Sequence, residues 1–403
     1  MRVLLSTIGS RGDVQPLVAL ALQLKELGEE ARVCAPPDFR DWVEDLGIPF
    51  VPLGPEVRST AKAGSSLLPA QPTAEQVRQM IEGTVATQFE TIPVAAEGCD
   101  VIVAGNALNI AARSVAEHMG VRYVFAAYCP ITLPSSHHAP PKVLAWAAED
   151  PAADDLTLWA EDAVRWTETW GPSLNAHRAA VGLAPVADVR GHILTDRPWL
   201  AADPTLAPWP EPGDPHVLQT GAWIMRDERP LSPELEEFLE GGEPPVYFGF
   251  GSIRAPQGLG TAMVEAARAL GRRVIVSRGW ADLAIVDDGP DCHAVGEVNQ
   301  QALFRRVAAV VHHGGAGTTT AAASAGAPQV VIPQHYDQHY FARRVSELGI
   351  GIAHPLVVPT TESLTDALEQ ALRPAVTARA RVVAKAVRTD GAMVAAQRLI
   401  AGG

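Results

Sequence analysis

One stretch of the sequence limits the possible folds of this chain most. It is a short apolar strand followed by a glycine-rich turn and a helix of small residues. The apolar run 308–311 is typical of a buried parallel strand. The turn after it contains Gly314, Gly315 and Gly317, and Thr318 opens an alanine-rich segment that we expect to be helical. Such a turn presents free backbone N–H groups and the positive end of a helix dipole to an anion. The stretch therefore predicts a phosphate site at the carboxyl edge of a parallel sheet.

Two other interpretations of this stretch stay open at this point. Small residues after a strand also occur where a helix packs tightly on a sheet without any ligand. Residues 307–336 contain no Asp, Glu, Lys or Arg, which is also a property of membrane spans, but two prolines, the glycines and the paired histidines argue against a span. His313 in the turn, and Asp337 and Gln338 beyond the next apolar strand, favour a ligand site.

Length and composition indicate a globular protein with two domains. A chain of 403 residues is long enough for two full cores. The net charge of −14 disfavours nucleic acid and anionic membranes as partners. The four cysteines form no CxxC pair, and the first apolar run is too short for a signal peptide. We therefore expect reduced thiols in a cytoplasmic protein with no stable membrane association.

Strands alternate with helices along both halves of the chain, which predicts an α/β fold with parallel, doubly wound sheets. Proline-rich residues 203–214 begin the expected linker, and the irregular stretches 57–73 and 130–154 are expected to carry recognition. The expected helices include 14–27, 74–97 with a break near Pro93, 156–170 and 338–348. The expected domains are an N-terminal Rossmann-like domain at 1–203, a linker at 204–233, a C-terminal Rossmann-like domain at 234–385, and a final helix at 386–403 that packs back on the first domain.

Several segments carry a resemblance to a known family. The pattern HHGGAGTT…GAPQ…P…DQ resembles the nucleotide-sugar signature of family-one inverting glycosyltransferases, which have two facing Rossmann-like domains (the GT-B architecture). The opening GSRGDVQPLVAL is similar to the start of bacterial antibiotic and sterol glycosyltransferases. The phrases shared with the glycopeptide-antibiotic enzymes of the vancomycin group are CAPPDF at 34–39, LQTGAWI at 218–224, DERPLSPEL at 227–235 and SRGWADL at 277–283. The resemblance covers essentially the whole chain.

This resemblance implies an inverting, metal-independent transfer of a sugar from a UDP- or TDP-sugar to an acceptor hydroxyl. The N-terminal half would bind the acceptor and the C-terminal half the nucleotide sugar. The implied acceptor is a glycopeptide antibiotic aglycone, and a polyketide, macrolide or sterol-like acceptor is the alternative. A sugar-nucleotide 2-epimerase and a non-catalytic binding homologue are the weaker alternatives. We expect a monomer with no cofactor besides the nucleotide-sugar co-substrate.

The turn Ser10-Arg11-Gly12-Asp13 is the candidate catalytic turn. Many plant relatives have a histidine there as general base, but no histidine precedes Asp13 in this chain. The carboxylate of Asp13 is the only base that the turn offers, and it resembles the residue assigned that role in the vancomycin group. The alternative is that Asp13 only caps the following helix. Asp337 is a second candidate base.

The remaining candidate residues belong to the donor side. Residues 249–254 read GFGSIR, and Arg254 replaces the third glycine of a dinucleotide fingerprint, so a nicotinamide site is disfavoured. By resemblance, Asp337 and Gln338 bind donor sugar hydroxyls, although Asp337 could be only a helix N-cap. No zinc-ligand spacing is present, so no metal site is expected. The residues implied in nucleotide or phosphate binding are Ser252, His313, Gly315, Gly317, Thr318, Arg278, Trp280 and Val298.

Overall fold

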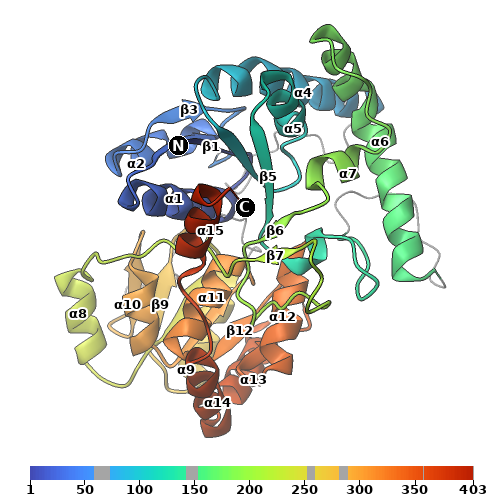
Figure 1. The fold of residues 1–403 in the computed structure, drawn as a ribbon. Helices are drawn as coiled ribbons and strands as arrows, with labels where there is room; N and C mark the ends of the chain where they lie inside the picture. The colour runs from blue at the N-terminus through green and yellow to red at the C-terminus, as the bar shows by residue number, and fades with distance from the viewer. Residues whose placement is uncertain (59–72, 142–152, 252–258, 281–288, 357, 403) are drawn as a thin grey trace.

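The computed structural model describes residues 1–58, 73–141, 153–251, 259–280, 289–356 and 358–402. They form two parallel sheets in two domains, one above the other in Figure 1. Ser252 and most of the two irregular stretches, at 59–72 and 142–152, lie outside the described residues. The predicted α/β class with two parallel sheets is confirmed.

The first sheet has the strand order β3-β2-β1-β4-β5-β6-β7, and all its neighbouring strands are parallel. Side chains of β1 alternate between two cores: Val3 and Leu5 face the core with α1, whereas Leu4 faces the core with α4 and α5. The strands are β1 Arg2–Thr7, β2 Glu30–Ala35, β3 Phe50–Pro52, β4 Val101–Gly105, β5 Arg122–Ala127, β6 Trp199–Leu200 and β7 Leu218–Gln219. The helices are α1 Arg11–Glu26, α2 Arg40–Asp45, α4 Ala74–Ala95, α5 Ala112–Met119, α6 Asp155–Ala180 and α7 Val189–Leu194.

The second sheet has the order β10-β9-β8-β11-β12-β13, again with every pair parallel. Val246 and Phe248 of β8 pack against α9 and α13, while Tyr247 between them faces the core beside α8 and α10. The strands are β8 Val246–Gly249, β9 Val274–Ser277, β10 Cys292–Val295, β11 Ala309–His312, β12 Gln329–Val331 and β13 Gly351–Ala353. The helices are α8 Pro233–Glu240, α9 Leu259–Ala269, α10 Gln300–Leu303, α11 Ala316–Ala325, α12 Asp337–Glu347, α13 Thr361–Ala371, α14 Pro374–Ala384 and α15 Gly391–Ile400.

The chain ends by returning to the first domain. Helix α15 lies beside α1 in Figure 1, and its Ala395 and Leu399 belong to the core formed with α1 and β1. At the start of α15 the backbone of Gly391 touches that of Gly221, where an added Cβ would overlap the Gly221 carbonyl. This close approach requires glycine. Strand β7 lies within the stretch expected as a linker, so the first sheet extends further along the chain than the sequence indicated.

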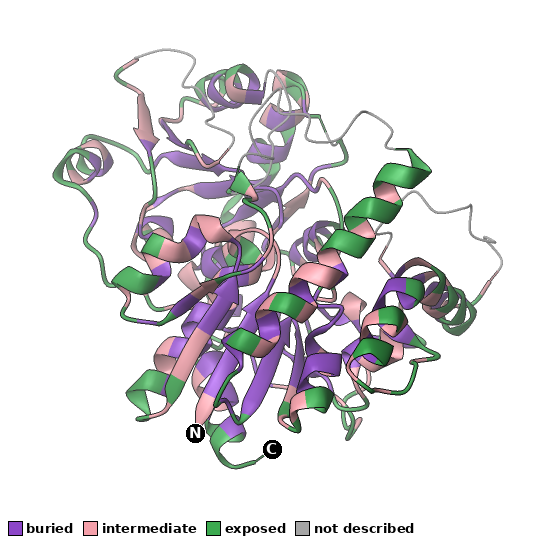
Figure 2. Ribbon diagram, turned by 90° about the horizontal axis from the view of Figure 1, so that it is seen from above, coloured by how far each residue is buried: buried purple, intermediate pink, exposed green. Residues whose placement is uncertain are grey.

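Several helix boundaries differ from the expectations. Helix α4 continues past Pro93, and α6 continues past Pro172 to Ala180. In α6 the buried Trp166 and Trp170 pack in one core with Leu174 beyond the proline, so tertiary packing keeps the helix continuous. Figure 2 shows the buried strands between helices whose outward faces are exposed.

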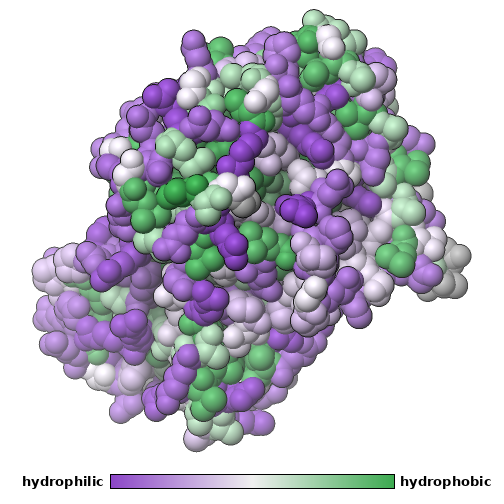
Figure 3. Space-filling model, in the orientation of Figure 1, coloured by the Kyte–Doolittle hydropathy of each residue, from purple (hydrophilic) through white to green (hydrophobic). Residues whose placement is uncertain are grey.

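Among the described residues, no helix is both long and apolar enough to span a membrane. Hydrophilic side chains are spread over both domains in the view of Figure 3.

Candidate active site

Asp13 lies in the first turn of α1, at the carboxyl end of β1. The helix begins at Arg11 with Ser10 as its N-cap, so Asp13 is not the N-cap itself, but it contributes to the cap as the third residue of a capping box. The Asp13 carboxylate reaches back and accepts a hydrogen bond of 2.8 Å from the Ser10 backbone N–H at Oδ2. Gly9 has a φ of +144°, and a Cβ at Gly9 would overlap that carboxylate. Glycine is therefore required for the carboxylate to fold back over the turn.

The other carboxylate oxygen of Asp13 meets Asn106, a residue that the sequence analysis missed. Asn106 follows β4, the neighbour of β1, and its Nδ2 donates to Asp13 Oδ1 over 3.0 Å. The Tyr128 hydroxyl donates to the Asp13 main-chain oxygen over 3.1 Å. Burial raises the pKa of the Asp13 carboxyl, while the donors from Asn106 and Ser10 lower it. A polar residue directly after a strand that neighbours β1 was the available signal for Asn106.

Asp337 faces the same region from the second domain. It is the first residue of α12, and the N-cap is Tyr336, so the alternative of Asp337 as N-cap is wrong. Burial, and then the negative charge of Asp13, raise the pKa of Asp337 to about 7. The two candidate carboxyl groups thus share one electrostatic environment although they are 324 positions apart in the chain. Gln338 Oε1 accepts from the Gln334 backbone N–H at 2.8 Å, so the amide nitrogen of Gln338 is the end suited to a sugar hydroxyl.

The glycine-rich turn between β11 and α11 carries His312 and His313 in different roles. His312 Nε2 is 2.9 Å from Gln329 Oε1 and its Nδ1 accepts from the Gly314 N–H, which fixes the ring inside the domain. His313 is also buried, but its Nδ1 has no hydrogen-bond partner among the described residues. Burial lowers the pKa of His313 to about 3, so its imidazole is neutral at pH 7. A buried, unpartnered ring nitrogen beside a helix N-terminus indicates a ligand position.

The start of α11 supplies further groups to this position. Gly315 is the N-cap, and a Cβ on it would run into the His313 ring. Gly317 is exposed and Thr318 is half-buried in the first helical turn. The hydroxyls of Thr319 and Thr320 donate to carbonyls of the preceding turn, which leaves Thr318 as the threonine suited to a phosphate oxygen. Free N–H groups of a helix N-terminus attract anions.

The other donor candidates lie at the carboxyl ends of β9 and β10. The backbone N–H of Arg278 donates to Val295, and that of Trp280 donates to Gly251. The Arg278 side chain is exposed, whereas Val298 packs partly against the core of its own domain. The Trp280 ring lies 5.6 Å from the Phe39 ring, centroid to centroid, and therefore contacts the first domain.

A second contact between the domains involves the candidate catalytic turn, Ser10–Asp13. The Arg11 guanidinium lies over the Trp42 ring, 3.4 Å from its centroid, and its Nη1 is 3.4 Å from Glu297 Oε1. Glu297 directly precedes Val298. The turn that holds Asp13 is thereby joined to the segment expected to meet the nucleotide base.

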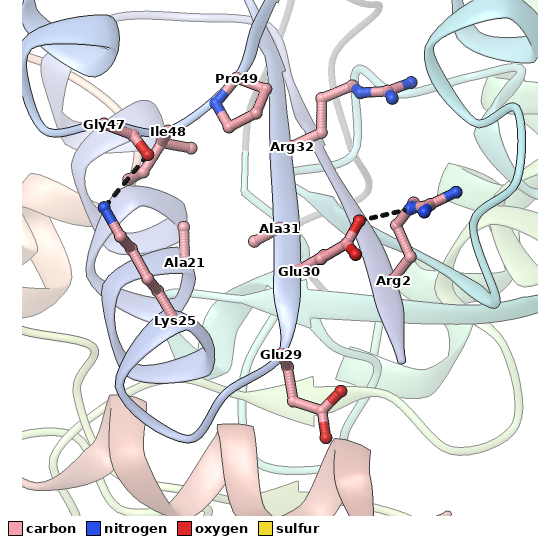
Figure 4. Close-up of a pocket in the computed structure, with 10 residues that line it drawn as sticks. All are labelled: Arg2, Ala21, Lys25, Glu29, Glu30, Ala31, Arg32, Gly47, Ile48 and Pro49. Carbon is pink, nitrogen blue, oxygen red and sulfur yellow. Dashed lines mark hydrogen bonds and ion pairs between the residues drawn. The ribbon is translucent and has the colours of Figure 1, made fainter.

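The hollow in Figure 4 lies at the opposite, amino-terminal edge of the first sheet and is not part of this site. Its charged groups are already paired: Arg2 Nε with Glu30, and Lys25 Nζ with the Gly47 carbonyl. The described residues contain no cluster of His, Cys, Asp and Glu suited to a metal ion.

The two halves of the chain match known protein families. Residues 3–135 match the glycosyltransferase family 28 N-terminal domain. Residues 262–397 match the erythromycin biosynthesis protein CIII-like, C-terminal domain. Among solved structures, the glycotransferase of kitacinnamycin has a TM-score of 0.72 at 20% identity, with 99% of this chain and 98% of that chain covered. Glycosyltransferase VinC in complex with dTDP has a TM-score of 0.68 at 20% identity over both full chains. These two likenesses show the GT-B fold.

Curated relatives are more similar still. Glycosyltransferase GtfE of Amycolatopsis orientalis is 53% identical, with 100% of this chain and 97% of the relative covered. The vancomycin aglycone glucosyltransferase of the same organism is 51% identical, with 99% and 97% covered. Sterol 3-beta-glucosyltransferase UGT80B1 of Arabidopsis thaliana is 29% identical, with 98% of this chain and 67% of the relative covered. On identity above one half over nearly its full length, this chain belongs to the vancomycin group of glycosyltransferases with the GT-B fold.

Proposed function

We propose that this enzyme transfers a sugar, with inversion, from a UDP- or TDP-sugar to a hydroxyl group of a glycopeptide antibiotic aglycone. The observation that carries the proposal is that a half-buried carboxylate, Asp13, and the glycine-rich turn at His313 follow the carboxyl ends of β1 and β11, one in each of the two domains. The donor class is supported by VinC, whose structure holds dTDP. The acceptor class is supported by the relatives named vancomycin aglycone glucosyltransferase and dTDP-epi-vancosaminyltransferase.

In this proposal Asp13 is the general base. Its carboxylate takes the proton from the acceptor hydroxyl while the hydroxyl oxygen attacks the anomeric carbon. The bond from that carbon to the diphosphate oxygen breaks on the opposite face, which inverts the configuration. The Ser10 N–H and the Asn106 amide hold the carboxylate from two sides, so its direction is set before the substrate binds.

Negative charge then grows on the leaving diphosphate, and the turn before α11 is suited to receive it. A neutral His313 can donate a hydrogen bond from its unpartnered Nδ1. The N–H groups near Gly317 and Thr318, together with the α11 dipole, add fixed positive potential there. This preorganised field lets an acidic protein stabilise a diphosphate without a metal ion. Ser252 remains a phosphate candidate by resemblance alone.

Asp337 and Gln338 are proposed to bind donor sugar hydroxyls. With a pKa near 7, Asp337 is a mixture of neutral and ionised forms at neutral pH and can donate or accept. Arg278, Trp280 and Val298 are proposed to line the nucleotide base. We also propose that residues 1–203 bind the acceptor and 234–385 the donor, in a monomer.

The cell compartment is a further part of the proposal. All four cysteines are free thiols, three of them buried, which is typical of the reducing cytoplasm.

A mass-spectrometric screen tests the proposal. Purified enzyme is incubated with each of several UDP- and TDP-sugars, alone and with glycopeptide, macrolide or sterol acceptors. A mass increase of one sugar residue on a glycopeptide aglycone is the expected result. Conversion of a sugar nucleotide without any acceptor would indicate the epimerase alternative. Glycosylation of a macrolide or sterol only would show that the acceptor is not a glycopeptide.

A further inference from the structure

The turn after β4 holds Asn106 in an unusual backbone conformation. Asn106 has a φ of 62°, one of three positive values among the described non-glycine residues, the others being at Thr195 and Tyr336. Left-handed backbone is unfavourable for most side chains, and asparagine tolerates it better than most. Residues in sparsely populated conformations persist where the surroundings determine them strongly, and they gather at functional sites.

Hydrogen bonds determine which end of the Asn106 side-chain amide is the oxygen and which is the nitrogen. Its Oδ1 accepts from the Leu108 backbone N–H at 2.9 Å, so this end of the amide must be the oxygen. The other end is then the NH₂ group, which donates to Asp13 Oδ1 and to the Ile8 carbonyl. The orientation of the amide therefore leaves no ambiguity: Asn106 presents a donor to the Asp13 carboxylate.

We propose that Asn106 is a positioning residue for the general base, which holds the Asp13 carboxylate aimed at the acceptor hydroxyl. This inference rests on the proposed role of Asp13. Donors approach the carboxylate from two sides, the Ser10 N–H at Oδ2 and the Asn106 amide at Oδ1. Together they fix the rotation of the carboxylate about its Cβ–Cγ bond, which a single donor would leave free.

The surroundings of Asp13 make this donor important. Burial disfavours the charged carboxylate, and the Asn106 bond is the largest influence in the opposite direction. The titratable neighbours of Asp13 do not stabilise its charged form. Asp337 is a second carboxyl group, and Tyr128 donates only to the main-chain oxygen of Asp13. Neutral hydrogen-bond donors are therefore the groups that oppose the effect of burial and favour the ionised form of the base.

An amide suits this position, and a carboxyl group does not. An aspartate at position 106 would place a second carboxyl group about 3 Å from Asp13, by the present donor–acceptor distance. Two carboxylates that close cannot both ionise and would share one proton, which raises the pKa of the pair. The Asp13 proton acceptor and the Asn106 donor are thus matched in chemistry.

The test is the pH dependence of kcat/KM for N106G and N106D. Glycine keeps the left-handed backbone and removes only the amide. Because activity requires the ionised base, its pKa appears as the acidic limb of the profile. We expect that limb to move up by about one pH unit in N106G and further in N106D. Turnover at a pH above the shifted limb should recover a large part of the loss.

Asn109 provides the matched control. It is buried in the same turn, where it bonds Ser6 Oγ and the Gly105 carbonyl but has no bond to Asp13. N109A should lower the unfolding midpoint without moving the acidic limb. An unmoved limb in both Asn106 variants, with loss of stability only, would overturn the positioning role.

A double-mutant cycle separates this inference from the proposed function. In a D13N background the amide has no carboxylate to position, so N106G should cause no further loss of turnover. Full activity of D13N would reject Asp13 as base and the proposed mechanism with it. An inactive D13N together with a further, additive loss from N106G would keep the base and reject the role of Asn106.

Discussion

The substitution Asp13→Asn discriminates most sharply between a catalytic and a structural role. The Asp13 carboxylate accepts from the Ser10 N–H at 2.8 Å on one oxygen and from the Asn106 amide at 3.0 Å on the other. Asparagine has one oxygen, so it can satisfy only one of these two donors. The donor left without an acceptor costs about 1–3 kcal/mol.

Loss of the buried charge acts in the opposite direction. Burial already raises the pKa of this carboxyl, so the folded protein gains from replacing the anion with a neutral amide. We therefore expect the unfolding free energy of D13N to lie within about 2 kcal/mol of the parent. A purely structural Asp13 would show only this small change.

Catalysis should respond far more strongly. Without a proton acceptor, turnover should fall by roughly 10²–10⁴, equivalent to about 2.7–5.4 kcal/mol of barrier. The assay is the initial rate at saturating donor and acceptor, with TDP or UDP affinity measured by calorimetry. Affinity for the nucleotide should stay near that of the parent, because Asp13 belongs to the N-terminal domain, which we propose to bind the acceptor.

Asp203→Asn is the matched control. Asp203 is a buried carboxylate that accepts from the backbone N–H groups of Thr205, Leu206 and Arg388. Its asparagine variant should lose stability and retain turnover. If D13N kept more than a tenth of the parent turnover while D337N lost it, Asp337 and not Asp13 would be the base.

Three further predictions concern the donor side and the domain contact. His313→Ala should weaken TDP or UDP binding about 10- to 150-fold, because a hydrogen bond to a charged group contributes roughly 1.5–3 kcal/mol. His312→Ala should lower the stability of the fold instead. Equal nucleotide affinities of the His313 variant and the parent, measured by calorimetry, would make His313 a packing residue. Asp337 has a folded pKa of about 7, above the unfolded value near 3.9, so its contribution to stability is full below about pH 4 and is lost as pH rises through 7. Thermal unfolding of Asp337→Asn should therefore show a gain over the parent at pH 8.5, of at most about 4 kcal/mol, that disappears at pH 4; an equal gain at both values would contradict the raised pKa. The ion pair between Arg11 and Glu297 joins the two domains, and its carboxylate is largely exposed. A double-mutant cycle on the free energy of unfolding should therefore give a coupling energy below about 1 kcal/mol that falls with added salt. A larger coupling energy that salt does not change would indicate a buried ion pair.

The sequence by itself determined the fold class and the glycine-rich turn before α11, because both follow from patterns that are local in the chain. Apolar runs separated by helical segments specify parallel strands wherever the chain later places them. The glycines around His313 mark a backbone that must turn sharply into a helix. Asp13 was identifiable because no other residue of its turn can accept a proton.

The first residue of each helix was harder to predict from the sequence. It depends on hydrogen bonds that form only in the folded chain. Ser10, not Asp13, caps α1, and Tyr336 with its positive φ precedes α12. In both cases an aspartate in the first turn of a helix looks like a cap. Only the backbone conformation and hydrogen bonds of the folded chain distinguish the N-cap from the first turn.

The pairing of groups across the site was decided by tertiary structure alone. Asn106 reaches Asp13 because β4 pairs with β1. Burial, and then the charge of Asp13, raise the pKa of Asp337 because the two domains face each other. The contact between Arg11 and Glu297 has the same origin. Hydrogen bonds and charges act over a few ångströms in space, and residues 93 or more positions apart reach that distance only when sheet order and domain packing bring them together.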